Sequence, residues 1–463
     1  MATLFLILSY CPSAVQADEP KAVTTKSIEG YWLGTLKLGA LDMRLGYRIK
    51  LKDDGTLTAT GDSIDQGTKD IPIQTVTFVG NTLTLKMPDM HAVYIGKLQP
   101  DGNTIKGELE KGTKLPLDLH RQNTPVVLVR PQTPVKPFPY VEEELTFPSK
   151  ANGVTLAGTF TKPTGPGPFA AVILISGSGP QDRDESVMGH KPFLVLSDHL
   201  TRKGIAVLRY DDRGTAKSSG VYESATTKDF ADDTRGAVAY LRARKDVGKI
   251  GLIGHSEGGI IAPIVATETS DVAFIVLLAG SGIPGDALII RQGELIARAM
   301  GVNDLAIASQ KTIQQKLFAI VKDVNEDTRK TSIFALEKDL SEPMKTALRS
   351  QMKLITSPWY MYFLSYDPRP SLRKVKCPVL ALNGDKDLQV PAVENLSEIE
   401  KAIRAGGNKD VTIKELPGLN HLFQPTKTGL LQEYGKIETT FDPATLDTIS
   451  EWIARHAGEN EKP

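Results

Sequence analysis

The sequence predicts an α/β protein: a mainly parallel, doubly wound sheet with a helical insertion, preceded by a small antiparallel β-domain. Three observations lead to this prediction. The first part of the chain consists of short runs of alternating apolar and polar residues broken by turn pairs. In the remainder, short and nearly continuous apolar runs alternate with helical stretches. The length of 463 residues exceeds what one ordinary core supports, so two domains are expected.

The start of the chain resembles a secretory signal peptide at 1–17. An apolar run, Leu4–Leu8, is followed by the small-residue stretch Ala14–Ala17, as expected at a cleavage site. A secreted or periplasmic protein is therefore predicted. No Lys or Arg precedes the apolar run, so a true start upstream and a frayed tail stay open as alternatives. Cleavage would remove Cys11 and leave Cys377, which we expect to be a buried structural thiol.

Residues 28–122 are expected to form the antiparallel domain, as a barrel or a sandwich. Turn pairs separate its alternating runs, which is typical of consecutive hairpins. These pairs are Asp54-Gly55, Gly80-Asn81 and Asp101-Gly102. A proline-rich segment at 123–141 follows and predicts an extended linker, because proline fixes φ and lacks an N–H donor. Its prolines are Pro125, Pro131, Pro134, Pro137 and Pro139.

The remainder, 142–459, has the pattern of strands buried on both faces and separated by helices. Such alternation implies right-handed βαβ units and a mainly parallel sheet. The strand-like runs are 169–175, 205–210, 249–253, 272–278 and 379–382, and the clearest helical stretches are 228–244 and 258–267.

A helical insertion is expected at about 283–372, where no clear strand occurs. Inserted between two sheet strands, it would lie over the carboxyl edge, where such sheets build their active sites. Its aromatic residues either line an acyl pocket or simply pack the insertion onto the domain. They are Trp359, Tyr360, Tyr362 and Phe363.

The composition excludes several classes of partner. The formal net charge is zero, so the chain has no broad field to capture nucleic acid or an anionic membrane. No later run reaches the roughly 20 apolar residues that span a bilayer. We therefore expect a small, nearly neutral ligand, no nucleic-acid partner and no transmembrane segment.

The segment 249–259 is an apolar strand that runs into G-x-S-x-G and then into a helix. This is the context of a nucleophile elbow, in which a tight turn lifts a serine out of the sheet. Gly254 and Gly258 are needed because side chains there would collide with the neighbouring strand or helix. Ser256 is therefore the predicted nucleophile, and the spacer His255 is expected to point away from the reaction.

A serine nucleophile needs a base oriented by a carboxylate. A buried strand ends in a loop with two candidate acids, Asp385 and Asp387. We favour Asp387, which is followed by Val390-Pro391, and expect Asp385 to cap the turn. His421 follows the last strand-like run and is the predicted general base, because the later His456 lies within the final helix.

The oxyanion hole is expected to use the main-chain N–H groups of Glu257 and Ser178. Ser178 lies in a glycine-rich loop after the first central strand, and it lacks the elbow that would make it a nucleophile. Two nearby arginines have mainly structural interpretations. Arg213 is expected to hold neighbouring loops, and Arg183 to join a local ion-pair network, with substrate binding as its alternative.

Together these motifs resemble bacterial carboxylesterases of the EstD type in the α/β-hydrolase superfamily, which neighbour the serine aminopeptidase and prolyl oligopeptidase groups. The resemblance covers about 142–456 and leaves out the β-domain. It rests on the segments 177–184, 211–214, 254–259, 383–390 and 419–421. The resemblance implies an α/β-hydrolase fold and an esterase of short or medium acyl chains.

The leading hypothesis is hydrolysis of carboxylic esters through an acyl-enzyme on Ser256, with no cofactor or metal required. A serine exopeptidase or thioesterase on the same triad is the first alternative. A propeller-type peptidase is disfavoured, because seven blades would need nearly 300 residues. The alternative of another class is an inert hydrolase-fold binding protein whose β-domain captures a glycan, lipid or partner. The sequence does not identify the β-domain ligand.

Overall fold

The computed structural model describes residues 25–38, 41–151, 153–323 and 325–458. Contacts within it divide the chain between Val127 and Leu128 into two units, except that Asp65–Gly67 groups with the second. The segment 1–17 and Cys11 lie outside the described residues, so the signal peptide and its consequence for localisation stay predictions.

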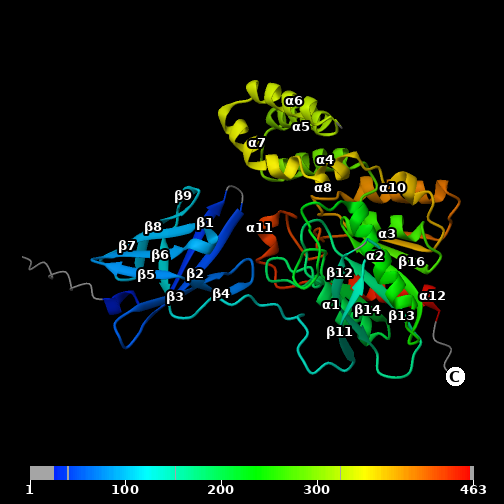
Figure 1. Ribbon diagram of the computed structural model, residues 1–463, viewed down its shortest axis with the longest axis horizontal. Helices are drawn as coiled ribbons and strands as arrows, with labels where there is room; N and C mark the ends of the chain where they lie inside the picture. The colour runs from blue at the N-terminus through cyan, green and yellow to red at the C-terminus, as the bar shows by residue number, and fades with distance from the viewer. Residues whose placement is uncertain (1–24, 39–40, 152, 324, 459–463) are drawn as a thin grey trace, which may run out of the picture. The chain divides into compact units, whose positions relative to one another are not determined.

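The first unit is one antiparallel sheet, which Figure 1 draws in blue and cyan. Its strands are β1 (Gly30–Leu38), β2 (Leu41–Leu51), β3 (Leu57–Ser63), β4 (Thr68–Ile73), β5 (Thr75–Val79), β6 (Thr82–Met87), β7 (Ala92–Leu98), β8 (Thr104–Lys111), β9 (Thr113–Pro116) and β10 (Leu119–Gln122). They follow the order β4-β3-β2-β1-β10-β8-β7-β6-β5, with β9 paired to β8. Two short 3-10 helices, Thr25–Ile28 and Pro88–Met90, complete the unit.

This sheet curls on itself. Strands far apart in its order, β3 and β5, lie in contact, so it is closer to the expected barrel than to a two-sheet sandwich. Alternate residues face its core, where Trp32, Tyr47 and Tyr94 are buried. Gly96 leaves room for one of these rings, because a Cβ there would lie 2.4 Å from the Tyr94 hydroxyl oxygen.

The expected linker is partly attached to the second unit. Residues 123–140, all of them described, form neither helix nor strand. From Leu128 onward, however, the segment groups with the second unit. The Gln132 side chain donates to the carbonyl of Phe441 (2.7 Å) and accepts from the N–H of Thr440 (2.7 Å). This half of the segment is thus anchored by amide hydrogen bonds that its prolines did not indicate.

The second unit contains a mainly parallel sheet of eight strands. They are β11 (Val141–Pro148), β12 (Thr155–Lys162), β13 (Phe169–Ile175), β14 (Ala206–Tyr210), β15 (Val247–His255), β16 (Val272–Leu278), β17 (Val379–Gly384) and β18 (Val411–Leu416). Their order is β11-β12-β14-β13-β15-β16-β17-β18. The pairs β11–β12 and β12–β14 are antiparallel, and all later pairs are parallel. The predicted fold class is confirmed.

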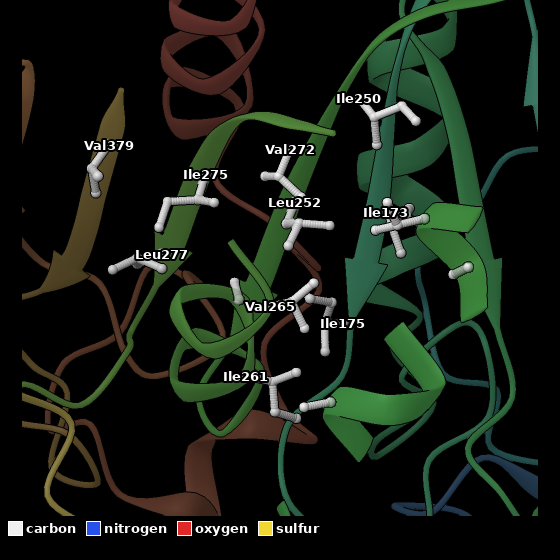
Figure 2. Packing of buried hydrophobic residues seen from close by; sticks show 14 of the residues in the cluster. Ile173, Ile175, Ile250, Leu252, Ile261, Val265, Val272, Ile275, Leu277 and Val379 are labelled. Carbon is white, nitrogen blue, oxygen red and sulfur yellow. The ribbon is translucent and has the colours of Figure 1, made fainter. Parts of the chain in front are cut away.

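Helices cover both faces of this sheet, and two apolar clusters fill the layers between. The helices are α1 (Pro192–Arg202) and α12 (Pro443–Ala457) on one face, and α2 (Thr227–Arg242), α3 (Gly258–Ala266) and α10 (Ala392–Ala405) on the other. Figure 2 shows the second layer, where Ile261 and Val265 of α3 meet Leu252 of β15 and Ile275 of β16. Burial of both faces explains why these strands read as continuous apolar runs.

The expected helical insertion is present between β16 and β17 and is called the cap below. It comprises α4 (Gly285–Ala299), α5 (Asp304–Val321), α6 (Glu326–Lys338), α7 (Glu342–Ile355), α8 (Pro358–Ser365) and α9 (Arg369–Leu372). A short helix, α11 (Leu431–Tyr434), follows β18. Leu288 of α4 and Phe363 of α8 pack on Ile260 of α3, which fixes the inner layer of the cap onto the sheet domain. Among the described helices, none combines the length and the apolar composition that crossing a bilayer requires.

Candidate active site

Ser256 lies in a tight turn between β15 and α3. Its φ is +52°, a left-handed conformation that a serine adopts only when its surroundings impose it. The Ser256 N–H donates to the carbonyl of Leu278 (2.8 Å). A Cβ at Gly254 would lie 2.0 Å from the Gly258 oxygen, and one at Gly258 would lie 2.1 Å from the Ile175 oxygen. The turn therefore requires glycine at both elbow positions.

His421 and Asp387, from two different loops, form a buried pair. The His421 Nδ1–H donates to Asp387 Oδ2 at 2.7 Å, and the two residues are 5% and 3% exposed. The other carboxylate oxygen of Asp387 accepts from the N–H groups of Gln389 (2.8 Å) and Val390 (2.9 Å). The carboxylate is therefore held at both oxygens, with one of them directed at the imidazole.

The alternative acid, Asp385, has a different task. Its carboxylate accepts from the N–H of Gly418 at 2.6 Å and so ties the β17 loop to the chain after β18. This is the turn-capping role expected from its position. In the structure it is Asp387, the acid favoured from the sequence, that contacts His421.

His255 is more than a spacer. Its Nδ1 lies 2.8 Å from Glu185 Oε1, and its Nε2 lies 2.9 Å from the carbonyl oxygen of His421. The expectation that it simply points away is therefore incomplete, because it holds the main chain of the loop that carries His421. Sequence reasoning missed Glu185, since nothing in the spacing of the chain connects it to a histidine 70 positions away.

His255 lies between two oxygen atoms, one of the Glu185 carboxylate and one of the His421 main chain. Burial alone would lower the pKa of His255, but the Glu185 carboxylate outweighs it and raises the pKa above the ordinary value. The same Glu185 oxygen also accepts from the N–H of Gly177 at 2.7 Å. The buried His255–Glu185 pair thus connects the elbow, the His421 loop and the loop after β13.

We expect this pair to make stability depend on pH. Because the folded state raises the pKa of His255, its stabilisation is complete below the unfolded pKa of about 6.5 and disappears as pH rises through the folded pKa. The free energy of unfolding should therefore fall as the pH rises through that window. Denaturant titrations at pH 6 to 9 check this, with Glu185→Gln as comparison. An equal fall in wild type and variant would contradict the assignment.

Two main-chain N–H groups near Ser256 are free to bind a ligand. In the loop after β13, the N–H of Gly177 donates to Glu185 and that of Gly179 donates to the Tyr222 hydroxyl (2.9 Å). In the part of the chain that the structure describes, the N–H groups of Ser178 and Glu257 have no protein acceptor. These are the two donors expected for an oxyanion hole.

A cavity of about 280 Å³ lies beside the turn that carries Ser256. Ser256, His421 and Ser178 line it, and α4 and α8 of the cap supply apolar walls. Other residues that line the cavity include Leu288, Trp359, Phe363, Gln181, Gln292, Gln389, Glu185, His255 and Tyr434. Of the four aromatic residues singled out in the insertion, Trp359 and Phe363 line the cavity. Tyr360 packs inside the cap, and Tyr362 stacks on Tyr366.

Asp212 holds the loop after β13 through hydrogen bonds. Its carboxylate accepts from the Ser176 hydroxyl (2.8 Å) and the Gln181 N–H (2.9 Å). Burial raises the pKa of Asp212 well above its ordinary value, although these two hydrogen bonds act against the shift. The loop that carries the free N–H of Ser178 is therefore braced at both ends.

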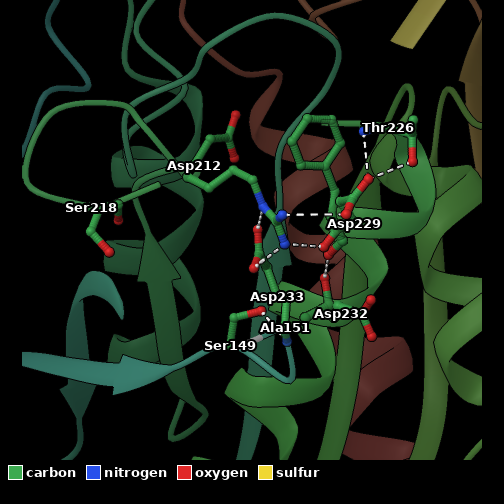
Figure 3. A network of polar contacts seen from close by, with 12 residues as sticks. Ser149, Ala151, Asp212, Ser218, Thr226, Asp229, Asp232 and Asp233 are labelled. Atoms are coloured by element: carbon green, nitrogen blue, oxygen red, sulfur yellow. Dashed lines mark hydrogen bonds and ion pairs between the residues drawn. The ribbon is translucent and has the colours of Figure 1, made fainter. Parts of the chain in front are cut away.

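The two arginines flanking this loop are structural. Arg213 forms a bidentate ion pair with Asp233 of α2 and donates to the Asp229 carbonyl (2.6 Å), a network drawn in Figure 3. Arg183 pairs with Asp211 and with Glu144 of β11. Neither arginine lines the cavity, so the substrate-binding alternative for Arg183 gains no support.

Cys377 is partly buried, and burial raises the pKa of its thiol to about 11, so the thiol is protonated near neutral pH.

Within the described ranges, no group of three or more His, Cys, Asp or Glu side chains is placed to hold a metal ion.

The chain is similar to several known proteins. The family described as serine aminopeptidase, S33 matches residues 191–424, a range that contains Ser256, Asp387 and His421. The chain is 28% identical over 325 residues to Esterase EstD of Thermotoga maritima, which covers 69% of each protein. Among solved structures, an esterase of Pyrococcus furiosus covers 69% of this chain and 94% of its own, with 17% identity and a TM-score of 0.41. A proline iminopeptidase-related protein of Thermus thermophilus covers 68% and 99%, with 16% identity and a TM-score of 0.41.

Proposed function

We propose that this chain, which belongs to the serine aminopeptidase S33 family, hydrolyses small, uncharged carboxylic esters through an acyl-enzyme on Ser256. The observation that carries the proposal is the shared cavity. The strained Ser256, His421 and Ser178 with its free N–H line one space of about 280 Å³. Asp387 holds His421 from behind this space, and Glu257, which carries the second free N–H, directly follows Ser256 in the turn. The name of the relative from Thermotoga maritima, an esterase, supports the same reaction class.

The proposed chemistry assigns one task to each group. Ser256 Oγ attacks the ester carbonyl carbon while His421 Nε2 accepts its proton, and Asp387 holds the imidazole through Nδ1. The N–H groups of Ser178 and Glu257 donate to the oxyanion of the tetrahedral intermediate. His421 then returns the proton to the leaving alcohol, which leaves an acyl group on Ser256. Water, deprotonated by His421, attacks this acyl-enzyme, and collapse of the second intermediate releases the acid and restores Ser256.

The cavity lining favours an ester over a peptide with a free amino terminus. An exopeptidase must neutralise the substrate's ammonium group, and Glu185 is the only carboxylate among the described lining residues. That carboxylate already contacts His255 in a buried pair. Apart from the imidazoles of His255 and His421, the remaining polar side chains of the lining are neutral amides and hydroxyls, such as those of Gln292 and Tyr434. These features suit a neutral substrate.

A p-nitrophenyl ester series from acetate to palmitate tests this proposal, with an aminoacyl p-nitroanilide and an acyl thioester beside it. A cavity of about 280 Å³ is slightly smaller than typical ligand pockets, which span roughly 300 to 1,000 Å³. We therefore expect turnover to be fastest with short or medium acyl chains. Faster cleavage of the anilide would indicate an exopeptidase, and faster cleavage of the thioester a thioesterase. No turnover of any of them would favour the inert binding protein.

A further inference from the structure

The side chain of Glu257 has no task in the proposed reaction, yet it is only 3% exposed. Its carboxylate accepts the indole N–H of Trp359, with both oxygens 2.9 Å from Nε1. It also accepts the hydroxyl of Thr227 at 2.7 Å. Trp359 belongs to α8 in the cap and Thr227 begins α2, so one carboxylate joins three separate elements directly behind the nucleophile.

This carboxylate is held by hydrogen bonds and not by a countercharge. Burial raises the pKa of Glu257, and the donors that act in the opposite direction are hydroxyl and indole groups, including the Ser178 hydroxyl. A buried carboxylate without a cation is costly unless its hydrogen bonds are kept. The contact with Trp359 is therefore one that the folded protein loses only at considerable cost.

The main chain and the side chain of Glu257 serve different parts of the proposed site, the oxyanion hole and the cavity wall. Its main-chain N–H is one of the two free donors at the elbow, and its side chain holds a ring that lines the cavity. The Trp359 ring stacks on Phe363, another lining residue, with centroids 5.5 Å apart. A shift of the carboxylate would therefore move the cavity wall and the N–H donor together.

We propose that Glu257 is a positioning residue: its carboxylate fixes Trp359 of the cap as a wall of the acyl pocket and keeps its own N–H aimed at the oxyanion. This inference rests on the proposed function, because it assigns a role within the same cavity. Under this proposal, the preference for acyl-chain length depends on the hydrogen bond between Trp359 of the cap and Glu257 of the elbow. Esters whose acyl chain reaches Trp359 should depend on it more than acetate does.

Glu257→Ala should lower kcat for every ester and raise KM mainly for butyrate and longer chains. We expect a loss of about 100-fold in kcat/KM for hexanoate, as for a misplaced catalytic geometry. Glu257→Gln keeps one acceptor oxygen and should recover kcat/KM to within about tenfold of wild type. Trp359→Phe removes the indole N–H and part of the ring but keeps an aromatic wall, and it should affect the longer esters without the general fall in kcat. An unchanged chain-length preference in both Glu257→Ala and Trp359→Phe would overturn the proposal.

Tryptophan fluorescence gives a readout independent of turnover. The chain has three tryptophans, and Trp32 and Trp452 are 0% and 2% exposed. Acrylamide quenching therefore reports on Trp359. It should increase in Glu257→Ala and return towards wild type in Glu257→Gln. Equal quenching in all three proteins would show that the carboxylate does not fix the ring.

A matched control loosens the cap elsewhere. Glu394 of α10 accepts from Arg291 of α4 at 2.7 Å, outside the catalytic cavity. Glu394→Gln should leave the chain-length preference unchanged, and a change equal to that of Glu257→Ala would overturn the specific role of Glu257.

A fluorophosphonate probe distinguishes failure of the inference about Glu257 from failure of the proposed function. If wild type is not labelled at Ser256, the esterase proposal fails. If it is labelled and Glu257→Ala reacts and selects as wild type does, only the present inference fails.

Discussion

Ser256→Ala should lower kcat for p-nitrophenyl esters by about 10⁶-fold, the scale seen when a serine nucleophile is removed from an intact site. The hydroxyl is the only atom of this residue that the proposed reaction uses. The turn itself is set by the glycines at 254 and 258 and by the bond from the Ser256 N–H to Leu278. The variant should therefore fold normally, and the loss should be chemical.

Another serine of the same cavity provides the comparison. Ser178→Ala removes a hydroxyl but keeps the main-chain N–H proposed for the oxyanion, so its loss should be about tenfold or less. Circular dichroism and thermal melting of both variants separate a folding defect from a catalytic one. A nearly inactive Ser178→Ala beside an active Ser256→Ala would reverse the assignment of the nucleophile.

The sheet could be predicted because its strands carry the signal locally. Burial on both faces makes β13, β15 and β16 continuous apolar runs, and the predicted run 272–278 coincides with β16. The hairpin turns were also local: Gly55, Gly80 and Gly102 each have a positive φ, as their turn pairs predicted. Element ends were less exact, and β15 begins at Val247, two positions before the predicted run.

Contacts between distant residues could not be predicted in the same way. Glu185 meets His255, and Glu257 meets Trp359 more than 100 positions later, through side chains that follow no period in the sequence. Such contacts depend on how the cap and the loops pack against the sheet. The elbow motif predicted the tight turn at Ser256, whereas the buried carboxylates around this turn are evident only from the three-dimensional structure.

The second largest effect should come from Asp387, the proposed acid of the triad, and its hydrogen bonds predict how an asparagine would lie in its place. Asp387 Oδ1 accepts from the N–H groups of Gln389 and Val390, so in Asp387→Asn the single amide oxygen should take that place. The amide NH₂ would then face Nδ1 of His421, which could only accept from it. The imidazole would carry its proton on Nε2 and could not take one from Ser256. We expect kcat to fall by about 10⁴-fold with little change in KM.

Asp385→Asn is the matched control, because Asp385 lies in the same loop and was the competing candidate for the acid. Its contact is the N–H of Gly418, and an asparagine oxygen can accept that bond as well. The variant should therefore lose about tenfold or less in kcat. If Asp385→Asn instead caused the larger loss, the acid would be Asp385, and the contact between Asp387 and His421 would serve only to hold the loop. If the two losses were equal, the orientation of His421 would have to depend on the whole loop and not on one carboxylate.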